Sequence, residues 1–576
     1  MNHAAHLLIT TAAMGAPGSA ERVAALTAIA APADVVYGGD AGHNSAGSGG
    51  LPPPAAYRAV VVDGTPAGME PEWVAALAAA VEEGSCLLVL APGAPGQFGS
   101  TTGAEAWSAL LGAVGGAPGP PGEWFAKPAF GSSPLTARMP DEFSLSDRLI
   151  SLDVTGHSQS VLTVSAGFRD RPAVIERRQG LGRVVVAGVG NETAALRHPE
   201  IVRLLRRALV PPASLDATER LVGLGILGYG SHGGMGLYHG LAARAVAGLE
   251  LVAACDGDAG RRKAAEEEFP GMRTYASTAD LEADDDVNAV VVATPPNSHF
   301  DLALSLLRAG KHVALEKPMC FTLQEADVLI EAALATRRTL TVHQSRRWDA
   351  DFLTVRRCVE GGELGEVFNV ETFVGGFEHP CRAWHSEVAV SGGAVYDWGS
   401  HHLDWIILLM GAFPVTLTAT GHKRVWHDIT NLDQVRVRMG FDDGREAEFL
   451  QSDLAGFRRP KFYVQGTKGT IVGNYRPVVF ERLEPGLGYV SEPAHHAEAP
   501  AELRLARYEA GYGLTESMLP SVRPERFGFH RNLADHLLLG EPLAVTPESV
   551  RQVVALLEAA QQSTDGGNVP ISLTRL

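Results

Sequence analysis

The stretch Leu224-Gly-Ile-Leu-Gly-Tyr-Gly-Ser-His-Gly233 decides the fold of the second half of this chain. An apolar run of strand length ends there in three glycines with the spacing G-x-G-x-x-G, and a helix-compatible segment follows. A second apolar run then ends in Asp256. The three glycines alone would be a weak signal in a chain with 64 glycines. The full order of strand, glycine loop, helix, strand and acidic residue predicts a Rossmann dinucleotide-binding unit.

Each part of this stretch has a physical role. We expect Gly228 to allow the tight turn, Gly230 to let the backbone approach a pyrophosphate, and Gly233 to let the helix pack on the strand. The N-terminus of that helix would offer free N–H groups to the phosphates. Asp256 would accept hydrogen bonds from a ribose diol, and its charge should repel a 2′-phosphate. We therefore predict NAD as the cofactor, preferred over NADP.

Composition limits the remaining possibilities. A chain of 576 residues is too long for one core and suggests three or four domains. With 48 basic and 66 acidic side chains, the net charge of −18 argues against nucleic acid or an anionic membrane as a partner. We find no apolar run long enough to span a bilayer and no basic secretory leader. Five scattered cysteines without a C-x-x-C motif indicate reduced thiols, so we expect a cytoplasmic protein.

Residues 1–212 read as an independent α/β unit. Short apolar runs alternate with an alanine-rich helix that begins at a proline, a pattern typical of a parallel sheet with helices on its faces. The strand-length runs are 7–10, 59–63 and 86–91, the helix is 71–83, and Gly/Pro-rich loops are expected at 38–54 and 112–122.

Three later stretches, 134–143, 171–190 and 198–208, resemble a trehalose-utilisation (ThuA-like) domain, a branch of the class I glutamine amidotransferase-like fold. Amidotransferases place a nucleophilic cysteine in a strand-to-helix elbow. Here Cys86 stands near the start of its strand, and the elbow region 91–97 has no thiol. We therefore expect 1–212 to be a non-catalytic accessory or assembly domain.

Residues 213–219 read as a linker, and 220–345 as the Rossmann dinucleotide-binding domain. Two later apolar runs of this domain end in polar residues, at Thr294-Pro-Pro-Asn-Ser-His299 and at Glu316-Lys-Pro318. In open parallel sheets, ligands bind outside the carboxyl ends of the strands. We therefore expect these two segments and the glycine loop to border one crevice.

These two segments, together with the later stretch Ser391-Gly-Gly-Ala-Val-Tyr-Asp-Trp-Gly-Ser-His-His-Leu-Asp404, resemble the glucose–fructose oxidoreductase/inositol dehydrogenase (Gfo/Idh/MocA) family. The resemblance implies that 346–576 form a C-terminal α/β domain with a large open sheet for substrate binding and oligomerisation. It also implies a carbohydrate or polyol substrate and a homo-oligomer, dimer or tetramer. The sequence departs from the family pattern at Ser391, where glycine is usual, and at Gln344-Ser345, where asparagine is common.

The 391–404 stretch also makes sense on physical grounds. Asp397, His401 and Asp404 are spaced i, i+4 and i+7, so they share one face of a helix. His402 lies about 100° away and should point elsewhere. Apolar residues on a neighbouring stripe should anchor the helix, which we expect to end near Gly411 and Pro414.

A single lysine, histidine or aspartate would most often be structural, so the prediction rests on their convergence. Oxidation of an alcohol needs a base for the hydroxyl proton and a positive charge for the developing alkoxide. We predict His401 as the base, because its reference pKa lies near the working pH. Lys317 would hydrogen-bond the hydroxyl oxygen, and Asp397 would orient His401 or the substrate. The family resemblance implies the same assignments.

The predicted site residues fall into three sets and include no metal ligands. The catalytic residues are Lys317, Asp397 and His401; the cofactor-binding residues are Gly228, Gly230, Ser231, His232, Gly233, Asp256, Thr294, Pro295, Asn297, His299, Glu316, Lys317 and Gln344; the substrate-binding residues are Arg346, Trp384, Asp397 and His401. Trp384 could stack on a sugar face or be a core side chain.

Three functions fit these residues. The first is an NAD-dependent dehydrogenase that oxidises a ring hydroxyl of a sugar, polyol or sugar derivative. The second is an NAD-dependent glycoside hydrolase that uses transient oxidation and elimination. The third is a non-catalytic NAD-binding sensor, which an intact Lys/Asp/His set disfavours.

Overall fold

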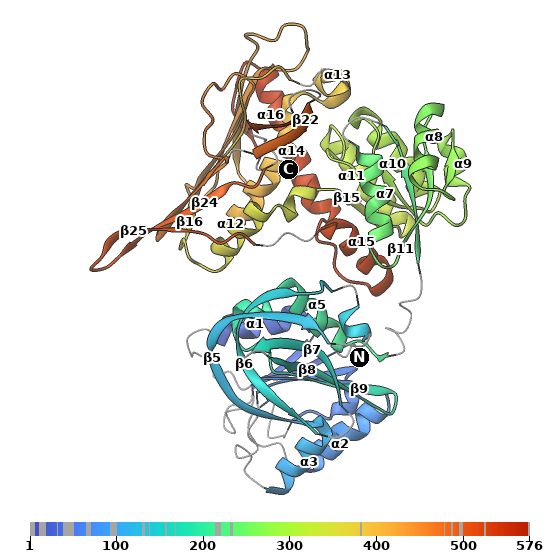
Figure 1. The fold of residues 1–576 in the computed structure, drawn as a ribbon, viewed down its shortest axis with the longest axis vertical. Helices are drawn as coiled ribbons and strands as arrows, with labels where there is room; N and C mark the ends of the chain where they lie inside the picture. Colours follow the sequence, from blue (N-terminus) through green and yellow to red (C-terminus); the bar gives the residue numbers. More distant parts are fainter. Residues whose placement is uncertain are drawn as a thin grey trace. The chain divides into compact units, whose positions relative to one another are not determined.

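The computed structural model describes most of the chain. The chain divides into two compact units, residues 1–220 and 221–576 (Figure 1). The described residues are 6–10, 19–30, 33–37, 51–64, 71–92, 101–129, 133–137, 139–155, 158–166, 169–212, 221–230, 234–380, 383–476, 478–484, 488–494, 499–522 and 526–573. No helix in these ranges has both the length and the apolar character needed to cross a bilayer.

The first unit contains a nine-stranded sheet of order β2-β1-β3-β4-β9-β8-β7-β5-β6. Its β2-β1-β3-β4-β9 half is parallel, and the remaining pairs are antiparallel. The strands are β1 (His6–Thr10), β2 (Ala33–Tyr37), β3 (Ala59–Asp63), β4 (Cys86–Leu90), β5 (Ala113–Pro128), β6 (Phe143–Val154), β7 (Gln159–Ala166), β8 (Arg169–Gln179) and β9 (Gly182–Ala187). The helices are α1 (Ser19–Ile29), α2 (Pro71–Glu82), α3 (Thr101–Leu111), α4 (Thr193–Leu196) and α5 (Pro199–Ala208), with short 3-10 turns η1 (Pro54–Ala56) and η3 (Pro134–Thr136).

The parallel strands and α2 occur where the apolar runs predicted them, but the loop predicted at 112–122 is wrong. This glycine- and proline-rich segment lies in β5. Along 113–124 the strand pairs with β6 alone, and its register shifts on either side of Pro118. Prolines lack an N–H, so a strand with one unpaired side and local irregularities can hold them. Of the other predicted loop, residues 38–50 lie outside the described ranges.

The second unit begins with a six-stranded parallel sheet of order β12-β11-β10-β13-β14-β15. The strand order reverses between β10 and β13, which creates a crevice at their carboxyl ends. The strands are β10 (Val222–Leu227), β11 (Leu249–Cys255), β12 (Arg273–Tyr275), β13 (Ala289–Val292), β14 (His312–Leu315) and β15 (Leu340–Val342). The helices are α7 (Met235–Ala245), α8 (Ala259–Glu268), α9 (Thr278–Glu282), α10 (His299–Arg308) and α11 (Leu323–Thr336), with the 3-10 turns η5 (Pro296–Ser298) and η6 (Ser345–Trp348).

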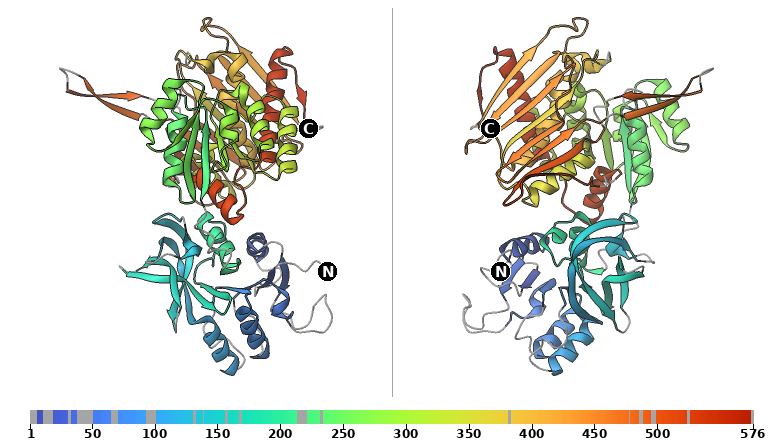
Figure 2. Two further views of the ribbon diagram at one scale, coloured as in Figure 1. Left: turned by 90° about the vertical axis from the view of Figure 1, so that its right-hand side faces the viewer. Right: turned by 60° about the vertical axis from the view of Figure 1, so that its left-hand side comes forward.

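A second nine-stranded sheet follows, of order β25-β24-β21-β20-β16-β19-β18-β17-β26. Figure 2 shows its broad open face. Its strands are β16 (Val367–Gly375), β17 (Thr416–His422), β18 (Gln434–Gly440), β19 (Glu446–Ser452), β20 (Phe462–Gly466), β21 (Gly469–Asn474), β24 (Glu502–Glu509), β25 (Gly513–Met518) and β26 (Ile571–Ser572); β22 (Val478–Glu484) and β23 (Gly488–Ala494) form a separate hairpin. The helices are α12 (Ala350–Glu360), α13 (Val388–Ser391), α14 (Ala394–Met410), α15 (Gly528–Leu539) and α16 (Pro547–Asp565), with the 3-10 turn η7 (Trp384–Ser386).

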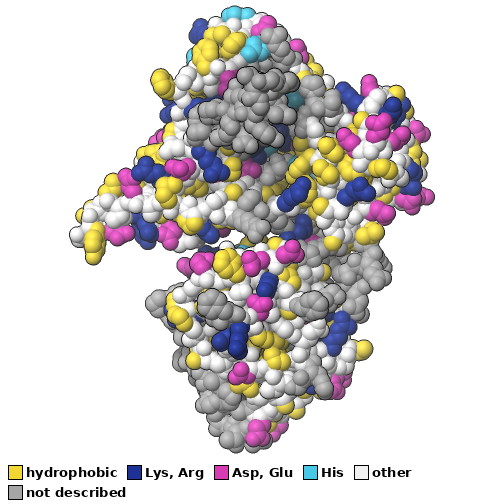
Figure 3. All heavy atoms as spheres, in the orientation of Figure 1, with side chains coloured by type: hydrophobic (Ala, Val, Ile, Leu, Met, Phe, Trp, Pro, Cys, Tyr) yellow, Lys and Arg dark blue, Asp and Glu magenta, His cyan; other side chains and the backbone are white. Residues whose placement is uncertain are grey.

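The helices α15 and α16, near the C-terminus, pack against the sheets of the second unit. Residues Phe529 and Leu533 of α15 lie in the apolar core of the Rossmann sheet. In α16, Val550 belongs to that core and Leu557 to the core beneath the second sheet. The C-terminal segment therefore joins both halves of this unit. On the face drawn in Figure 3, acidic and basic side chains of the described residues are interspersed, with no continuous basic patch.

Candidate functional site

The glycine loop after β10 fits a close approach between backbone segments. Gly228 has φ +91°, and a Cβ on it would lie 2.8 Å from the Thr294 amide nitrogen and 2.9 Å from the Ala293 carbonyl carbon. Only glycine fits there. A Cβ on Gly230 would meet only the Arg261 guanidinium, at 3.3 Å. Ser231, His232 and Gly233 lie outside the described residues, and α7 begins at Met235.

Asp256 holds the glycine loop against the end of β11. Its Oδ2 accepts a hydrogen bond from the Tyr229 N–H and its Oδ1 accepts one from the Asp258 N–H, both at 2.9 Å. The Arg261 guanidinium lies 3.7 Å from Oδ2, and 46% of its side chain is exposed. The positively charged Arg261 side chain therefore lies beside Asp256, the residue predicted to bind the ribose. The sequence analysis missed Arg261; an arginine five positions after the acidic residue was the available signal.

His299 was predicted to contact the cofactor, but its ring bridges two strand ends. Nδ1 lies 2.7 Å from the Pro318 carbonyl oxygen, and Nε2 lies 2.9 Å from the Thr294 carbonyl oxygen. Burial lowers the pKa of this fully buried imidazole, and the contacts with the two carbonyl oxygens oppose that shift. Next to it, the Thr294 and Ser298 hydroxyls are 2.7 Å apart, while Pro295 is half-buried and Asn297 is exposed.

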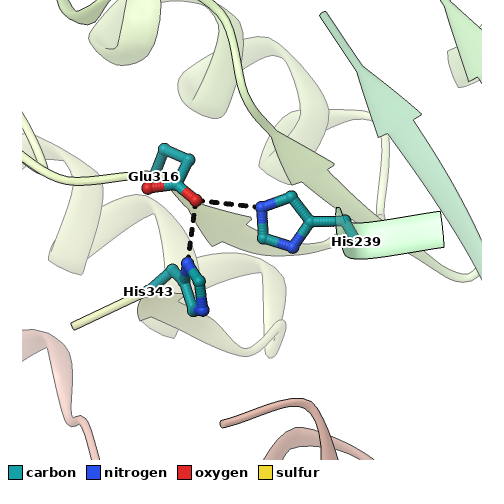
Figure 4. A group of neighbouring side chains, drawn as sticks. All are labelled: His239, Glu316 and His343. Carbon is teal, nitrogen blue, oxygen red and sulfur yellow. Dashed lines mark hydrogen bonds and ion pairs between the residues drawn. The ribbon is translucent and has the colours of Figure 1, made fainter. Parts of the chain in front are cut away.

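Glu316, directly after β14, is surrounded by histidines (Figure 4). Its Oε1 lies 2.9 Å from His239 Nε2 and 2.8 Å from His343 Nδ1. His530 Nε2 in turn lies 2.8 Å from His239 Nδ1. Burial raises the pKa of Glu316, but the charge interaction and hydrogen bonds from His343 and His239 outweigh it and hold the pKa well below its usual value. Burial lowers the pKa of both His239 and His530.

His239, Glu316 and His343 also have the composition of a metal site, because their ligand atoms lie within 4.8 Å of one another. Two imidazoles and one carboxylate are donors that transition metals use. The N···O distances of 2.8 and 2.9 Å are those of N–H···O hydrogen bonds, and protons alone account for them. That the chain needs no metal stays a prediction.

Lys317 reaches from β14 to the first turn of α14. Its ammonium donates to Asp397 Oδ1 at 2.5 Å and to the Asp397 carbonyl oxygen at 3.1 Å. Burial raises the pKa of Asp397, but Lys317 outweighs it and the net shift is downward. The Asp397 carboxylate therefore orients Lys317, whereas we expected it to orient His401 or the substrate. Within the described residues, no hydrogen bond joins the Asp397 and His401 side chains.

His401 lies one turn further along α14 and is buried. Burial first, and then the positive charges of Lys317 and Arg346, hold its pKa well below the usual value. Its Nδ1 has no hydrogen-bond partner in the described part of the chain. The imidazole is therefore neutral and near an ammonium group, but it is a weaker base than we predicted from its reference pKa.

The other residues of the α14 face are structural. Asp404 receives two hydrogen bonds from Arg347, at 2.6 and 2.8 Å. His402 packs on Trp405 and Phe449, with ring centroids 4.8 and 4.9 Å away. The helix ends at Gly411, whose φ of +61° confirms the predicted C-terminus.

The remaining predicted ligands border α14 or the loop before it. Gln344 is buried; its amide donates to the Ser400 carbonyl oxygen at 3.1 Å, and its Oε1 has no partner among the described residues. The Arg346 guanidinium lies 4.9 Å from the centre of the Trp398 ring. Trp384 stacks on the neighbouring His385 ring, with centroids 3.6 Å apart.

Asp453, directly after β19, is a titratable group that the sequence analysis missed. Burial and then the charge of Asp433 raise its pKa to about 7, and the Asp397 charge adds to the effect. Gln451 donates a hydrogen bond to Asp453 Oδ2 at 2.9 Å. A half-buried carboxyl whose pKa is raised to about 7 and that interacts with Asp397 is typical of a functional site.

Comparisons with known proteins agree with this geometry. Residues 222–344 match the family model of the Gfo/Idh/MocA oxidoreductase family with an NAD-binding Rossmann fold, and 352–472 match its C-terminal domain. The inositol 2-dehydrogenase of Rhizobium meliloti is 30% identical over 301 residues, which are 50% of this chain and 85% of that protein. The chain belongs to the Gfo/Idh/MocA family. The predicted family resemblance is therefore confirmed for the second unit.

Other relatives in the family differ in their named cofactor. The scyllo-inositol 2-dehydrogenase (NADP(+)) of Bacillus subtilis is 25% identical over 344 residues, covering 59% of this chain and 93% of its own. The crystal structure of an NAD-binding protein from Listeria innocua, 29% identical, aligns with a TM-score of 0.52 over 61% of this chain and 97% of its own. Membership in the family thus shows an oxidoreductase with an NAD-binding Rossmann fold. The cofactors named for these relatives leave the choice between NAD and NADP to local residues.

Proposed function

We propose that this chain is an NAD-dependent dehydrogenase that oxidises a ring hydroxyl of a sugar, polyol or sugar derivative. The observation that carries the proposal is the Lys317–Asp397 ion pair at the carboxyl end of a Rossmann strand, together with the neutral His401, whose Nδ1 has no partner among the described residues. Inositol 2-dehydrogenase and 1,5-anhydro-D-fructose reductase among the relatives support a polyol or sugar as substrate.

The crevice fits a nicotinamide dinucleotide, which supplies the hydride acceptor when bound. Gly228 leaves no room for a side chain next to Thr294, as a cradle for a pyrophosphate requires. The buried Gln344 Oε1 keeps an acceptor for a polar ligand group.

Each member of the catalytic set has one task. Lys317, held by Asp397, would donate a hydrogen bond to the substrate hydroxyl oxygen and stabilise the negative charge that develops there. His401 would accept the hydroxyl proton on its free ring nitrogen, since burial keeps the imidazole neutral. Arg346 and Trp384 would contact the remainder of the substrate.

We further propose NAD as the preferred dinucleotide. The buried Asp256 carboxylate supports this choice, because a 2′-phosphate placed there would be repelled. Arg261 opposes it, because its exposed guanidinium could pair with such a phosphate. We give Asp256 the greater weight, since its carboxylate is fixed by two backbone N–H groups.

A second candidate is an NAD-dependent glycoside hydrolase. The sugar would be oxidised transiently with bound NAD as the hydride acceptor, the aglycone would be eliminated, water would add, and the sugar would be reduced again by the NADH formed. Asp453 favours it, because a carboxyl whose pKa is raised to about 7 can protonate a leaving group near neutral pH. The same Lys317, Asp397 and His401 would serve both reactions.

One experiment separates the candidates. The full chain is incubated with NAD and a panel of sugars, polyols and aryl glycosides, while reduced cofactor and released aglycone are measured together. Stoichiometric NADH supports the dehydrogenase, whereas aglycone release without net NADH supports the hydrolase. Either activity should disappear in Lys317→Ala and persist in Lys311→Ala, the matched control at the other end of β14, whose ammonium donates to the Asp284 carbonyl oxygen. If neither activity appears while NAD binds, both enzymatic proposals fail and the sensor remains.

For the rest of the chain we propose a ThuA-like, non-catalytic module over 1–212, a linker over 213–219, and domains over 220–345 and 346–576. Cys86 supports the first point, because burial raises the pKa of its thiol to about 11 and disfavours the reactive thiolate. We also propose a homo-oligomer and a cytoplasmic location, the latter because the four cysteines in the described ranges form no disulfide. The test is a protein truncated to begin at residue 214. If it kept full activity and the same oligomeric state, the 1–212 module would be required for neither catalysis nor oligomerisation.

A further inference from the structure

Glu316 is a buried carboxylate whose side-chain partners are all imidazoles. Its Oε1 meets His239 and His343, and its Oε2 accepts the backbone N–H of Lys317 at 3.2 Å. The Lys317 ammonium itself goes to Asp397. Among the described residues, no lysine or arginine forms an ion pair with Glu316.

The hydrogen bonds of the cluster can all be made with one proton on each ring. His530 Nε2–H donates to His239 Nδ1, His239 Nε2–H donates to Glu316, and His343 Nδ1–H donates to Glu316. With this assignment, the cluster carries only the charge of −1 of its carboxylate. The lowered pKa of Glu316 means that this carboxylate is ionised.

Nearby cations do not cancel this charge, because each has its own carboxylate. Lys317 pairs with Asp397 at 2.5 Å, and Arg346 pairs with Asp349 at 3.2 Å. Glu316 is thus the uncompensated ion of this edge of the sheet, and a charge in a poorly solvated environment acts more strongly than one in water.

The position of Glu316 places its negative charge near the proposed binding site of the nicotinamide half of the dinucleotide. Asp256 ends β11, on one side of the glycine loop, and would hold the adenosine ribose; the nicotinamide half then lies over the ends of β13 and β14 on the other side. Glu316 follows β14 directly, and 13% of its side chain is exposed, against 0% for His239 and 2% for His343. The carboxylate is therefore the least enclosed member of its cluster.

We propose that Glu316 makes the site discriminate between cofactor redox states, because its uncompensated charge favours the cationic, oxidised nicotinamide ring over the neutral, reduced ring. This inference rests on the proposed dinucleotide site and adds a selectivity to it. A ligand can shift an equilibrium only by its differential affinity for two states, and here the carboxylate supplies the difference. Product NADH would then leave more easily than NAD.

The test is a binding measurement on the full chain, independent of turnover. Dissociation constants for NAD and NADH are measured by calorimetry, and their ratio is compared among variants; NADP and NADPH replace them if they bind more tightly. Glu316→Gln should lower the preference for the oxidised form about tenfold, or ~1.4 kcal/mol. Glu316→Asp keeps the charge and should keep the preference. His530→Phe is the matched control, because it removes one ring of the cluster and leaves the carboxylate.

The outcomes are separable. An unchanged ratio in a folded Glu316→Gln protein, or an equal change in His530→Phe, overturns the inference while the dinucleotide site stands. If Glu316→Gln does not fold, His343→Lys decides, because it retains the carboxylate but pairs it with a cation. That variant should lower the preference to a similar extent, and an unchanged ratio would overturn the inference. Failure of the wild-type chain to bind either form would instead overturn the proposed function itself.

Discussion

The two units of this chain both place a carboxylate beside a basic side chain near the end of a parallel strand, with different results. In the first unit, Asp63 at the end of β3 pairs with Arg22 at 2.5 Å and accepts the Thr10 hydroxyl at 3.0 Å. Arg22 also donates to the carbonyl oxygens of Gly190 and Asn191. The carboxylate and the guanidinium of this cluster bind one another, the Thr10 hydroxyl and backbone carbonyls, while Asn191 Oδ1 has no partner among the described residues. We expect the cluster to stabilise the unit.

In the second unit, the Lys317–Asp397 pair is equally close, but its neighbours are not saturated. His401 Nδ1 and Gln344 Oε1 keep no partner within the described residues. Buried polar atoms without partners are costly, so they persist where a ligand can satisfy them. Asn191 Oδ1 beside the first pair also has no partner among the described residues. The difference is therefore chemical, because an imidazole nitrogen near an ammonium group can accept a proton, whereas an amide oxygen cannot.

Asp397→Asn tests the functional side of this comparison and should have the largest effect. It removes the charge that holds Lys317, so we expect kcat/KM to fall about a thousandfold, or ~4 kcal/mol. The measurement is the rate of cofactor reduction with the best substrate of the panel. Turnover within about threefold of the wild type would contradict the catalytic set.

Asp63→Asn is the matched change in the first unit and should act on stability alone. Breaking a largely buried ion pair should destabilise that unit by about 3 kcal/mol, because Arg22 is left without its partner. Calorimetry would show one of two unfolding transitions shifted to lower temperature, with dinucleotide affinity unchanged. A loss of affinity would show that the units are functionally coupled.

Sequence reasoning placed Asp397 and His401 on one helix face because helical periodicity is a local property. It could not show that Asp404, on the same face, pairs with Arg347, since that contact depends on a segment 57 residues away. In the same way, the three histidines around Glu316 come from distant parts of the chain. Only the folded sheet brings them together.

The wrong prediction of a loop at 112–122, where the structure has β5, also arises because long-range contacts override local sequence preference. The glycines and prolines of β5 have poor intrinsic strand preference, yet tertiary pairing with β6 determines its structure. His299 shows the converse, because a motif residue that resembles a ligand instead bridges two carbonyl groups. Local patterns therefore identified most of the elements, whereas hydrogen-bond partners depended on long-range packing. The site residues themselves stay predictions.

Acidification should affect the two units in opposite directions. In the second unit, burial lowers the pKa of six histidines, His239, His299, His312, His401, His402 and His530. Below about pH 6.5 the unfolded chain then binds more protons, and each group can cost about 2 kcal/mol of stability between pH 6.5 and 5. Asp349 and Asp453, with pKa values raised to about 6 and 7, oppose this trend but are fewer.

In the first unit, burial raises the pKa of Asp147 and Glu200. There the folded state binds more protons, so stability rises as pH falls through these raised values. Calorimetry at pH 7.5 and 5 should show the transition of the second unit moving down and that of the first unit holding or moving up. The Asp63→Asn variant identifies which transition belongs to the first unit. A downward shift of both would contradict the assignment.

The smallest effect should come from the two residues at the adenosine end of the crevice, whose charges oppose each other. Asp256→Ala removes the repulsion of a 2′-phosphate and leaves Arg261 to attract it, so the ratio of NAD to NADP affinity should fall about tenfold, or ~1.4 kcal/mol. Arg261→Ala is the matched control and should raise the same ratio a few-fold, because its side chain is half-exposed and screened by solvent. Both ratios come from calorimetric titrations at one salt concentration. If Asp256→Ala left the ratio unchanged, selectivity at this end would lie with Arg261 or the loop, and Asp256 would serve only to hold Tyr229 in place.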